Sequence, residues 1–318
     1  MRNWGNSFSN PNVLSREDKM SIISSTMYSN QPTFRDFRKC DGFSNEEIQK
    51  DEKELRKKMN TISHKDRAPS DDMFAESMEP VLAYILNDQR LLPSRDDNYS
   101  FMASEYDDKC KGTDIVFGVM NRNKDGHLVF AVDVATGTRR ENIMEKFNNS
   151  YDKYNGVTDL HYCMHDDRKW KEPMAPHFVL GMSPASQANA LDKFVFEGNE
   201  LKGREKDTER DFIVLSELCE QIYLHLAMVR TSSELSELKE EKTKKLKDFL
   251  MAVNAGLYRI LGITSKEFPD SKNRENVFNE RYQSMGKNLQ RKDVVYANIL
   301  AETWKRRHAT MAKVATRK

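Results

Sequence analysis

The chain has 318 residues, of which 38% are hydrophobic and 32% are charged. This composition is polar for a globular protein but too apolar for a wholly disordered one, so it predicts one large domain or two modest ones. The net charge of +1 excludes a global field that would draw the protein onto nucleic acid or membrane, so any such attraction must come from local patches.

The four cysteines are far apart and form no CxxC pair. This pattern argues against a disulfide framework and against a cysteine zinc site, and it is typical of reduced thiols in a cytosol. The first residues lack the apolar core of a signal peptide, and no apolar run approaches transmembrane length. The sequence therefore predicts a soluble cytoplasmic protein with no membrane partner.

Residues 1–70 form a polar N-terminal segment. Residues 1–45 are rich in Ser, Asn, Asp and Arg, and we expect them to be irregular or partly disordered. Residues 45–62 are predicted to form one charged helix, capped by Asn45, with acidic residues in its first turn and basic residues in its last. The stretch 63–72 has the composition of a linker.

Residues 71–205 are predicted to form an α/β core in which helices flank a mixed central sheet. It opens with a helix from Ser70 that Pro80 either kinks or divides in two. Five strands follow, with a helix between the third and the fourth. The expected strands are 99–105, 113–120, 127–134, 157–164 and 177–182.

Two helices of this core have recognisable ends. Thr138 and Glu141 form a capping box, and Asn155–Gly156 closes the same helix. Ser183 precedes a proline that suits the first turn of the second helix.

Residues 206–318 are predicted to be helical, in three long patterns of which the last breaks near Gly286. The tail from Trp304 carries six Lys or Arg residues and no acid, so it could contact nucleic-acid backbone or be a solvated helix end. The region is also a possible surface for a protein partner or for self-association. The apolar residues expected inside are Leu218, Ile222, Leu226, Phe249, Leu257, Ile260, Val295 and Ile299.

An aspartate stands at the outer end of each strand of one predicted hairpin. The numbers of Asp114 and Asp133 sum to 247, which centres the turn within the polar connection 121–124 and makes the two aspartates cross-strand neighbours or close diagonals. Both strands are apolar at nearly every position, which is typical of central strands covered on both faces. Adjacent carboxylates there repel each other and lose hydration, and a divalent cation such as Mg²⁺ would compensate them. Alternatively, each aspartate simply caps a turn or a helix.

The arrangement resembles the PD-(D/E)xK nuclease superfamily, in which a helix with a glutamate precedes a hairpin with Asp on one strand and Asp or Glu on the next, and a helix follows. "AESMEPVLAYIL" matches the acidic helix, "GTDIVF" the first motif and "FAVDVATG" the second. The likeness covers about residues 71–195. It implies a restriction-endonuclease-like fold and a nuclease that uses Mg²⁺ or Mn²⁺ to hydrolyse phosphodiester bonds in DNA or RNA.

The resemblance also implies a metal site formed by Asp114, Asp133 and Glu79. Glu76 is an alternative to Glu79. The acidic stretch that precedes Asp114 offers a further ligand, for which Asp108 is the first choice. The alternative for that stretch, which also holds Glu105 and Asp107, is a solvated acidic loop.

The superfamily pattern places a lysine two residues after the second acid, where this chain has Ala135. In some members that lysine lies on the next helix, so Lys146 is the candidate catalytic lysine, with Arg139 and Arg140 as alternatives. Together with Glu79, Asp114 and Asp133 it would complete the catalytic set. If no basic residue reaches the site, the chain is instead a catalytically inactive nucleic-acid-binding or scaffold protein on the same fold, or an assembly protein that functions through its C-terminal helices.

Overall fold

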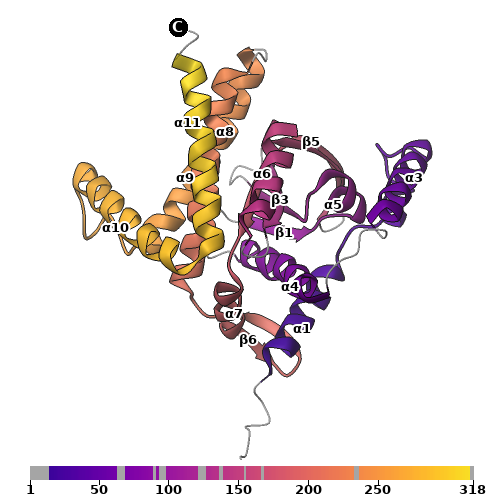
Figure 1. Ribbon diagram of the computed structural model, residues 1–318, viewed down its shortest axis with the longest axis horizontal. Coiled ribbons are helices and arrows are strands. Elements are labelled where there is room, and N and C mark those ends of the chain that lie inside the picture. The colour runs from indigo at the N-terminus through magenta and orange to yellow at the C-terminus, as the bar shows by residue number, and fades with distance from the viewer. Residues whose placement is uncertain are drawn as a thin grey trace, which may run out of the picture.

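The computed structural model describes the chain outside residues 1–13, 63–68, 89–90, 93–97, 121–126, 136–138, 154, 166–167, 233–235 and 316–318. It is a mixed α/β structure in which helices flank a five-stranded central sheet, followed by a helical C-terminal region (Figure 1). This confirms the coarse fold class and the predicted helical character of the C-terminal third.

The sheet has the order β1-β2-β3-β5-β4. Strands β3 and β5 are parallel, and the other three neighbouring pairs are antiparallel. The strands are β1 (Asn98–Met102), β2 (Ile115–Met120), β3 (His127–Ala135), β4 (Val157–His165) and β5 (Arg168–Gly181). The parallel pair is possible because α6 (Arg140–Phe147) and a π-helical turn (Asn148–Lys153) carry the chain across between β3 and β4.

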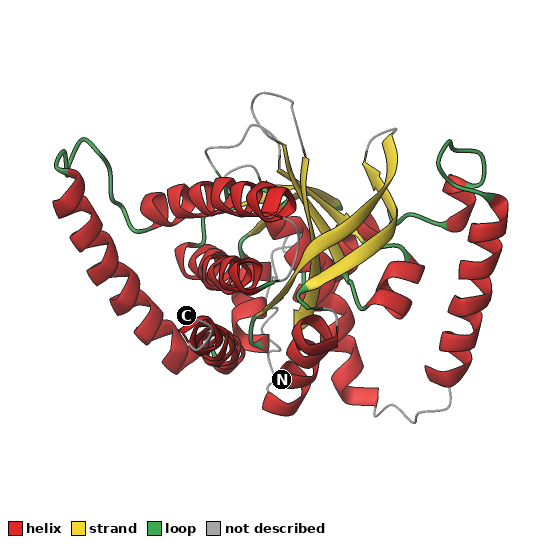
Figure 2. Cartoon of the chain, turned by 90° about the horizontal axis from the view of Figure 1, so that it is seen from above, coloured by secondary structure: helices red, strands yellow, loops and turns green. Residues whose placement is uncertain are grey.

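Strands β2 and β3 are apolar on both sides because each face of the sheet is covered. Phe117 and Phe130 face the largest hydrophobic cluster, which α4 (Pro69–Leu86), α8 (Thr208–Thr231) and α9 (Ser236–Ile260) complete. Figure 2 shows the long C-terminal helices on one side of the strands and α3 (Asn45–Ile62) at the far end of the molecule. The core is therefore shared between the sheet and the C-terminal helices.

Helix α8 also completes the hydrogen bonding of β5. Beyond residue 176, the β4 ladder ends and the backbone of β5 has strand β3 on one side only. On the other side the Gln221 amide bonds both backbone groups of Val179, at 2.8 and 2.7 Å, and Glu217 accepts from the Gly181 N–H at 3.1 Å. The next residue along this face of α8 is His225, whose Nε2 lies 3.1 Å from the carbonyl oxygen of residue 177. Four residues of an α-helix and two residues of a β-strand span similar lengths. Successive side chains on this face of α8 therefore stay aligned with alternate residues of β5.

The N-terminal segment contains structure that composition did not indicate. Helices α1 (Arg16–Tyr28) and α2 (Phe34–Phe37) lie within the stretch expected to be irregular. Ser15 and Asp18 form a capping box at the start of α1, and a buried pair, Ile23 and Met27, joins that helix to the core.

Helix α3 has its predicted span but not its predicted ends. Its cap is Ser44, whose hydroxyl accepts from the Glu47 N–H at 3.1 Å, and not Asn45, which is the first helical residue. The expected basic last turn is also wrong, because the basic residues of this helix lie before the final turn. The linker expected at 63–72 falls largely outside the described residues, and α4 already begins at Pro69 as a single helix with Pro80 inside it.

Three assignments in the core need correction. The first strand ends at Met102, and the following acidic stretch is helix α5 (Glu105–Lys111), capped by the Ser104 hydroxyl, rather than a solvated loop. Strand β5 begins at Arg168, nine residues before its predicted start at 177. After α7 (Pro184–Asp192), which Ser183 caps as expected, the structure has a small hairpin that is not among the five expected strands. Its strands are β6 (Phe194–Glu197) and β7 (Glu200–Arg204).

The C-terminal region has four helices among the described residues, since α10 (Ser271–Lys292) and α11 (Val294–Ala315) separate at Asp293 and not near Gly286, which lies inside α10. All of the expected interior positions are buried, which confirms the helical periodicity: Leu218, Ile222, Leu226, Phe249, Leu257, Ile260, Val295 and Ile299.

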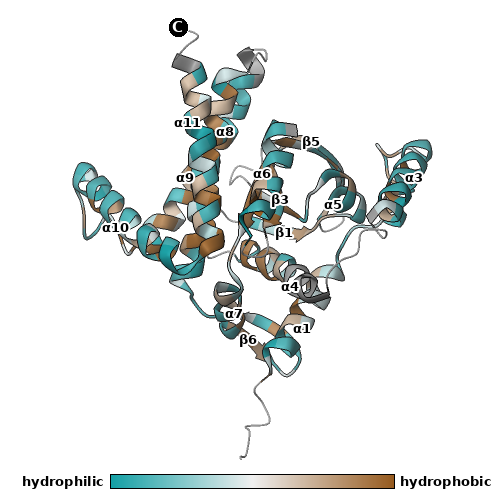
Figure 3. Ribbon diagram, in the orientation of Figure 1, coloured by the Kyte–Doolittle hydropathy of each residue, from teal (hydrophilic) through white to brown (hydrophobic). Residues whose placement is uncertain are grey.

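Within the described residues, α8 alone is long and apolar enough to cross a membrane, and 83% of its most apolar window is buried inside the fold. This burial is what a core helix shows. Figure 3 shows the contrast with α3 and α10, whose surfaces are mainly hydrophilic. The cytoplasmic location stays a prediction.

Replacement of Phe249 by Ala tests whether the sheet and the C-terminal helices share one core. The ring is fully buried and stacks on Phe130 with centroids 4.2 Å apart, so we expect the free energy of unfolding to fall by about 3–5 kcal/mol in a single transition measured by urea denaturation. Met251 on the same helix is 63% exposed, and its replacement by Ala should change stability by less than about 0.5 kcal/mol. Two separate transitions in Phe249→Ala would show that the regions fold independently.

Candidate active site

The two hairpin aspartates lie together at one end of β2 and β3. Ile115 pairs with Val132, whose numbers also sum to 247, and Asp114 and Asp133 each stand one residue beyond that pair. The Asp114 side chain takes the place of a ladder carbonyl, because its Oδ2 accepts from the Val134 N–H at 2.6 Å. The predicted convergence of the two carboxylates on adjacent central strands is therefore confirmed.

Lys146 contacts both carboxylates. Its Nζ forms an ion pair with Asp133 and lies 3.5 Å from Oδ2 of Asp114. The two aspartate side chains are 9% and 8% exposed, whereas that of Lys146 is 29% exposed. Lys146 therefore reaches both aspartates from α6, the helix on which the candidate lysine was expected. Arg139 and Arg140, the alternatives, are exposed at the start of that helix.

Two further carboxyl groups join this cluster from helices α4 and α5. Glu79 accepts a hydrogen bond from the Tyr28 hydroxyl at 3.2 Å, and Asp108 forms an ion pair with Lys109 at 2.6 Å. The negative charge of Asp114 acts on both Glu79 and Asp108. In Figure 1, α4, α5 and α6 surround β1 and β3, which explains how segments distant in sequence reach one place.

Burial and mutual repulsion shift the pKa values of these acids upward. Burial, followed by the charges of Asp114 and Asp108, raises the pKa of Glu79 to about 9. Burial, followed by the charge of Asp114, raises the pKa of Asp108 to about 6. Burial also raises the pKa of Asp114 to about 6, with Lys146 opposing this rise and Asp133 adding to it. Burial lowers the pKa of Lys146, but Asp114 and Asp133 more than offset it, so the ammonium group stays charged.

Of the remaining acidic candidates, one is buried with a structural role and another is exposed to solvent. Asp107 is fully buried, and its carboxylate accepts from the backbone N–H groups of His161 and Tyr162 at 2.9 Å, so it joins α5 to β4. Glu105 is exposed. The side chain of Glu76 lies outside the described residues. Thr138, the predicted cap of the following helix, also lies outside them, and the N-cap of α6 in the structure is Arg139.

The carboxyl groups do not form a complete set of metal ligands in this structure. Among the side chains that the structure describes, no three from Asp, Glu, His and Cys converge closely enough to hold one metal ion. The charge balance nevertheless suits a divalent cation. Glu79, Asp108, Asp114 and Asp133 share their surroundings with two ammonium groups, those of the lysines at 109 and 146, so full ionisation leaves two negative charges uncompensated.

Two neighbours of the cluster were missed from the sequence. Tyr28 comes from α1, which composition did not predict, and His177 comes from β5, where a single histidine in a strand carries no distinguishing pattern. Burial, with Lys146 adding to it and Asp114 opposing it, lowers the pKa of His177 to about 4. The parallel pairing of β3 and β5 is the information that places this histidine beside the aspartates, and a lone sequence does not supply it.

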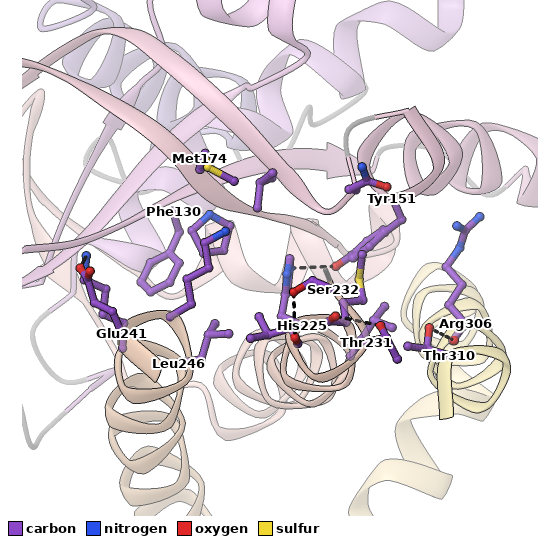
Figure 4. Close-up of a pocket in the computed structure, with 18 of the residues that line it drawn as sticks. Phe130, Tyr151, Met174, His225, Thr231, Ser232, Glu241, Leu246, Arg306 and Thr310 are labelled. Carbon is purple, nitrogen blue, oxygen red and sulfur yellow. Dashed lines mark hydrogen bonds and ion pairs between the residues drawn. The ribbon is translucent and has the colours of Figure 1, made fainter. Parts of the chain in front are cut away.

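A separate groove of about 1030 Å³ lies between the sheet and the C-terminal helices. Figure 4 shows Phe130 and Met174 of the sheet on one side, Leu246 of α9 and Arg306 of α11 on others, and His225 among them. The five residues of the carboxylate–lysine cluster do not line it. Its Arg306 is engaged by Asp152 at 2.6 Å, so the groove presents no free charge at that point. The groove and the carboxylate–lysine cluster are therefore separate features of the described structure.

No protein-family model, curated protein or solved structure matches the chain. The geometry of the cluster is thus the observation from which function has to be inferred.

Glu79→Gln tests the electrostatic state of the cluster. A carboxyl whose pKa is raised from 4.5 to about 9 contributes most to stability below pH 4.5, and that contribution is lost as the pH rises toward 9. Because Gln imitates the protonated form, the variant should match the wild type near pH ~5 and melt about 1–2 °C higher near pH ~9, the effect of ~1 kcal/mol in a chain of this size. Thermal melts across this range measure the difference. A constant offset at all pH values would show that Glu79 is not held in the field of the other carboxylates.

Proposed function

We propose that the protein is a divalent-metal-dependent nuclease of the PD-(D/E)xK type, with Asp114, Asp133, Lys146 and Glu79 as its catalytic residues. One observation carries the proposal: Lys146, on the helix that follows the hairpin, reaches both aspartates. An antiparallel hairpin next to a parallel strand, with an acidic helix before it, also agrees with a restriction-endonuclease-like sheet.

Asp114 and Asp133 would hold the ion, and Glu79 would complete the set from α4. Carboxylate oxygens are the ligands that Mg²⁺ and Mn²⁺ favour. A bound ion lowers the pKa of a coordinated water and stabilises negative charge on a phosphoryl group. Burial is the main cause of the raised pKa values of Glu79 and Asp114, and repulsion from neighbouring carboxylates adds to it. A bound ion would offset that repulsion, so ion binding and folding should support each other.

Lys146 is suited to two tasks at such a site. Its ammonium group, which contacts Asp133 and which a bound ion would displace from that carboxylate, can orient an attacking water, and its charge can stabilise the negative charge that develops on the phosphate. The partial exposure of this side chain lets it reach a bound phosphodiester, whereas the aspartates are nearly closed off. We therefore propose nucleic acid, either DNA or RNA, as the substrate class.

One observation favours the alternative of an inactive scaffold or nucleic-acid-binding protein. Lys146 already compensates both aspartates without any ion, so the cluster could be a structural ion-pair network that joins α6 to the sheet. The two proposals differ in what added metal does to the protein.

Cleavage of labelled single- and double-stranded nucleic acid with Mg²⁺ or Mn²⁺ tests the nuclease proposal. We expect Asp133→Asn to abolish cleavage and Lys146→Met to lower its rate by at least about 100-fold, since each removes charge stabilisation from the reaction. Glu145→Gln, which changes an exposed carboxylate one residue from Lys146, should leave the rate unchanged.

Thermal melts of the same proteins distinguish a failed assay from a wrong proposal. Metal at 100 times its dissociation constant should stabilise the wild type by about 2.7 kcal/mol and leave Asp133→Asn unaffected. If metal shifts neither protein, and Asp133→Asn is destabilised, the ion-pair network is structural and the scaffold proposal stands.

A further inference from the structure

The groove between the sheet and the C-terminal helices lies where β3 and β5 separate. The two strands pair in parallel from Ala131 and His177 onward, whereas the preceding part of β5 pairs with β4 instead. Pro173 and Pro176 lie in that part, and neither has the backbone N–H that a continued ladder with β3 would use. The opening of about 1030 Å³ therefore follows from the course of the strands, and Leu246 of α9 lines another of its sides (Figure 4).

The interior of the groove is mainly apolar. Phe130 of β3, Leu224 of α8 and Leu246 of α9 line it, and each of these side chains is at most 4% exposed. A space of this size with apolar walls and a few polar groups is typical of a site for a small organic ligand. The polar groups of the lining therefore indicate which kind of ligand fits.

His225 contributes a hydrogen-bond acceptor to this lining. Its Nε2 lies 3.1 Å from the carbonyl oxygen of residue 177 and 3.3 Å from the Tyr151 hydroxyl. Because a carbonyl only accepts, Nε2 carries the proton and Nδ1 is left with a lone pair. Burial lowers the pKa of His225 to about 4, so the ring is neutral at pH 7.

This acceptor is available to a ligand. Nδ1 of His225 makes no hydrogen bond within the part of the chain that the structure describes, and it is not sealed off from solvent. The residue is only 4% exposed, so few waters reach it. Buried polar groups are nearly always paired, and an N–H or O–H group of a molecule in the groove would supply the missing donor.

The solvent side of the groove carries more basic than acidic side chains. The charged residues among its described lining are Lys242, Lys245, Arg306 and Lys313, with Asp152, Glu172 and Glu241. Arg306 contacts Asp152 at 2.6 Å, and Lys245 contacts Glu241 at 2.8 Å. Burial raises the pKa of the remaining acid, Glu172. The surplus charge of the lining is therefore positive, which favours an anionic group at the mouth of the groove.

We propose that this groove binds a small amphipathic anion, whose apolar body carries an N–H or O–H donor for His225 and a carboxylate, sulfonate or phosphate for the lysines at the mouth. The apolar walls bind the body by removing it from water. A wholly apolar ligand would leave the acceptor unpaired and would gain nothing from the lysines. The inference is independent of the proposed function, because the residues of the carboxylate–lysine cluster do not line the groove.

Titration of the full chain with 1-anilinonaphthalene-8-sulfonate tests the proposal. This fluorescent probe has an apolar aromatic body, one N–H donor and one sulfonate. We expect its fluorescence to rise to saturation at one probe per chain, and the melting temperature of the protein to increase because the probe binds the folded state.

Two substitutions test the polar contacts of the probe. His225→Phe removes the acceptor and Lys245→Ala removes a charge, and each should weaken probe binding by at least about threefold. Lys244→Ala is the matched control for the charge, because Lys244 is the exposed neighbour of Lys245 on α9 and does not line the groove. It should leave the affinity unchanged.

Met228→Trp tests the location of the site and does not depend on the His225 variant being stable. Met228 is half-buried on α8 and lines the groove, so the larger ring should fill the space and abolish binding. Met251→Trp places the same ring on the exposed side of α9 and should bind the probe as the wild type does. The proposal is overturned if no saturable binding occurs or if Met228→Trp binds normally. Binding that Met228→Trp abolishes, but that neither His225→Phe nor Lys245→Ala weakens, overturns the proposed class of ligand.

Discussion

Two nearly buried carboxylates share one lysine, and much of the fold serves to hold them there. Charges removed from water are tolerated only when they are paired, so β2, β3 and α6 must meet at one point to bring Asp114, Asp133 and Lys146 together. Asp114 also replaces a backbone acceptor for Val134, which ties the position of its carboxylate to the ladder itself. A structure that separated these elements would leave uncompensated charge in its interior.

The C-terminal helices contribute to this arrangement from a distance. Gln221 and Glu217 of α8 supply the hydrogen bonds that β5 lacks on its open side, and Phe249 of α9 stacks on the opposite face of β3. Strand β5 in turn holds His177 beside Asp133. The helical region is therefore part of what shapes the cluster, rather than an independent addition to an α/β core.

The hairpin was the part of the molecule that residue patterns predicted best. Continuous apolar runs identify covered strands, and antiparallel pairing is a matter of counting, so the partnership of Asp114 and Asp133 follows from residue numbers. Lys146 was predicted only from the resemblance, in which the lysine of some members lies on the next helix. Helical periodicity identified the buried residues of α8, α9 and α11 equally well.

The sequence failed where tertiary contacts decide the structure. Helix α5 is short and acidic, and it forms because Ser104 caps it and the carboxylate of Asp107 bonds the backbone of β4. Helix α1 has little amphipathic character, so only its docking on α4 reveals its two buried residues. The position of His177 near Asp133 follows only from the parallel pairing of β5 with β3. None of these contacts leaves a periodic trace in one sequence.

The central claim is that a divalent ion replaces the Lys146 ammonium as the charge partner of Asp114 and Asp133. Crystals of the protein grown with Mn²⁺ and measured at the manganese absorption edge test it most directly. We predict an anomalous peak between the two carboxylates, within about 2.0–2.6 Å of their oxygens, and a lysine ammonium withdrawn from Asp133. Ordered electron density for an unchanged Lys146–Asp133 ion pair, with no anomalous peak at the hairpin end under saturating Mn²⁺, would contradict it.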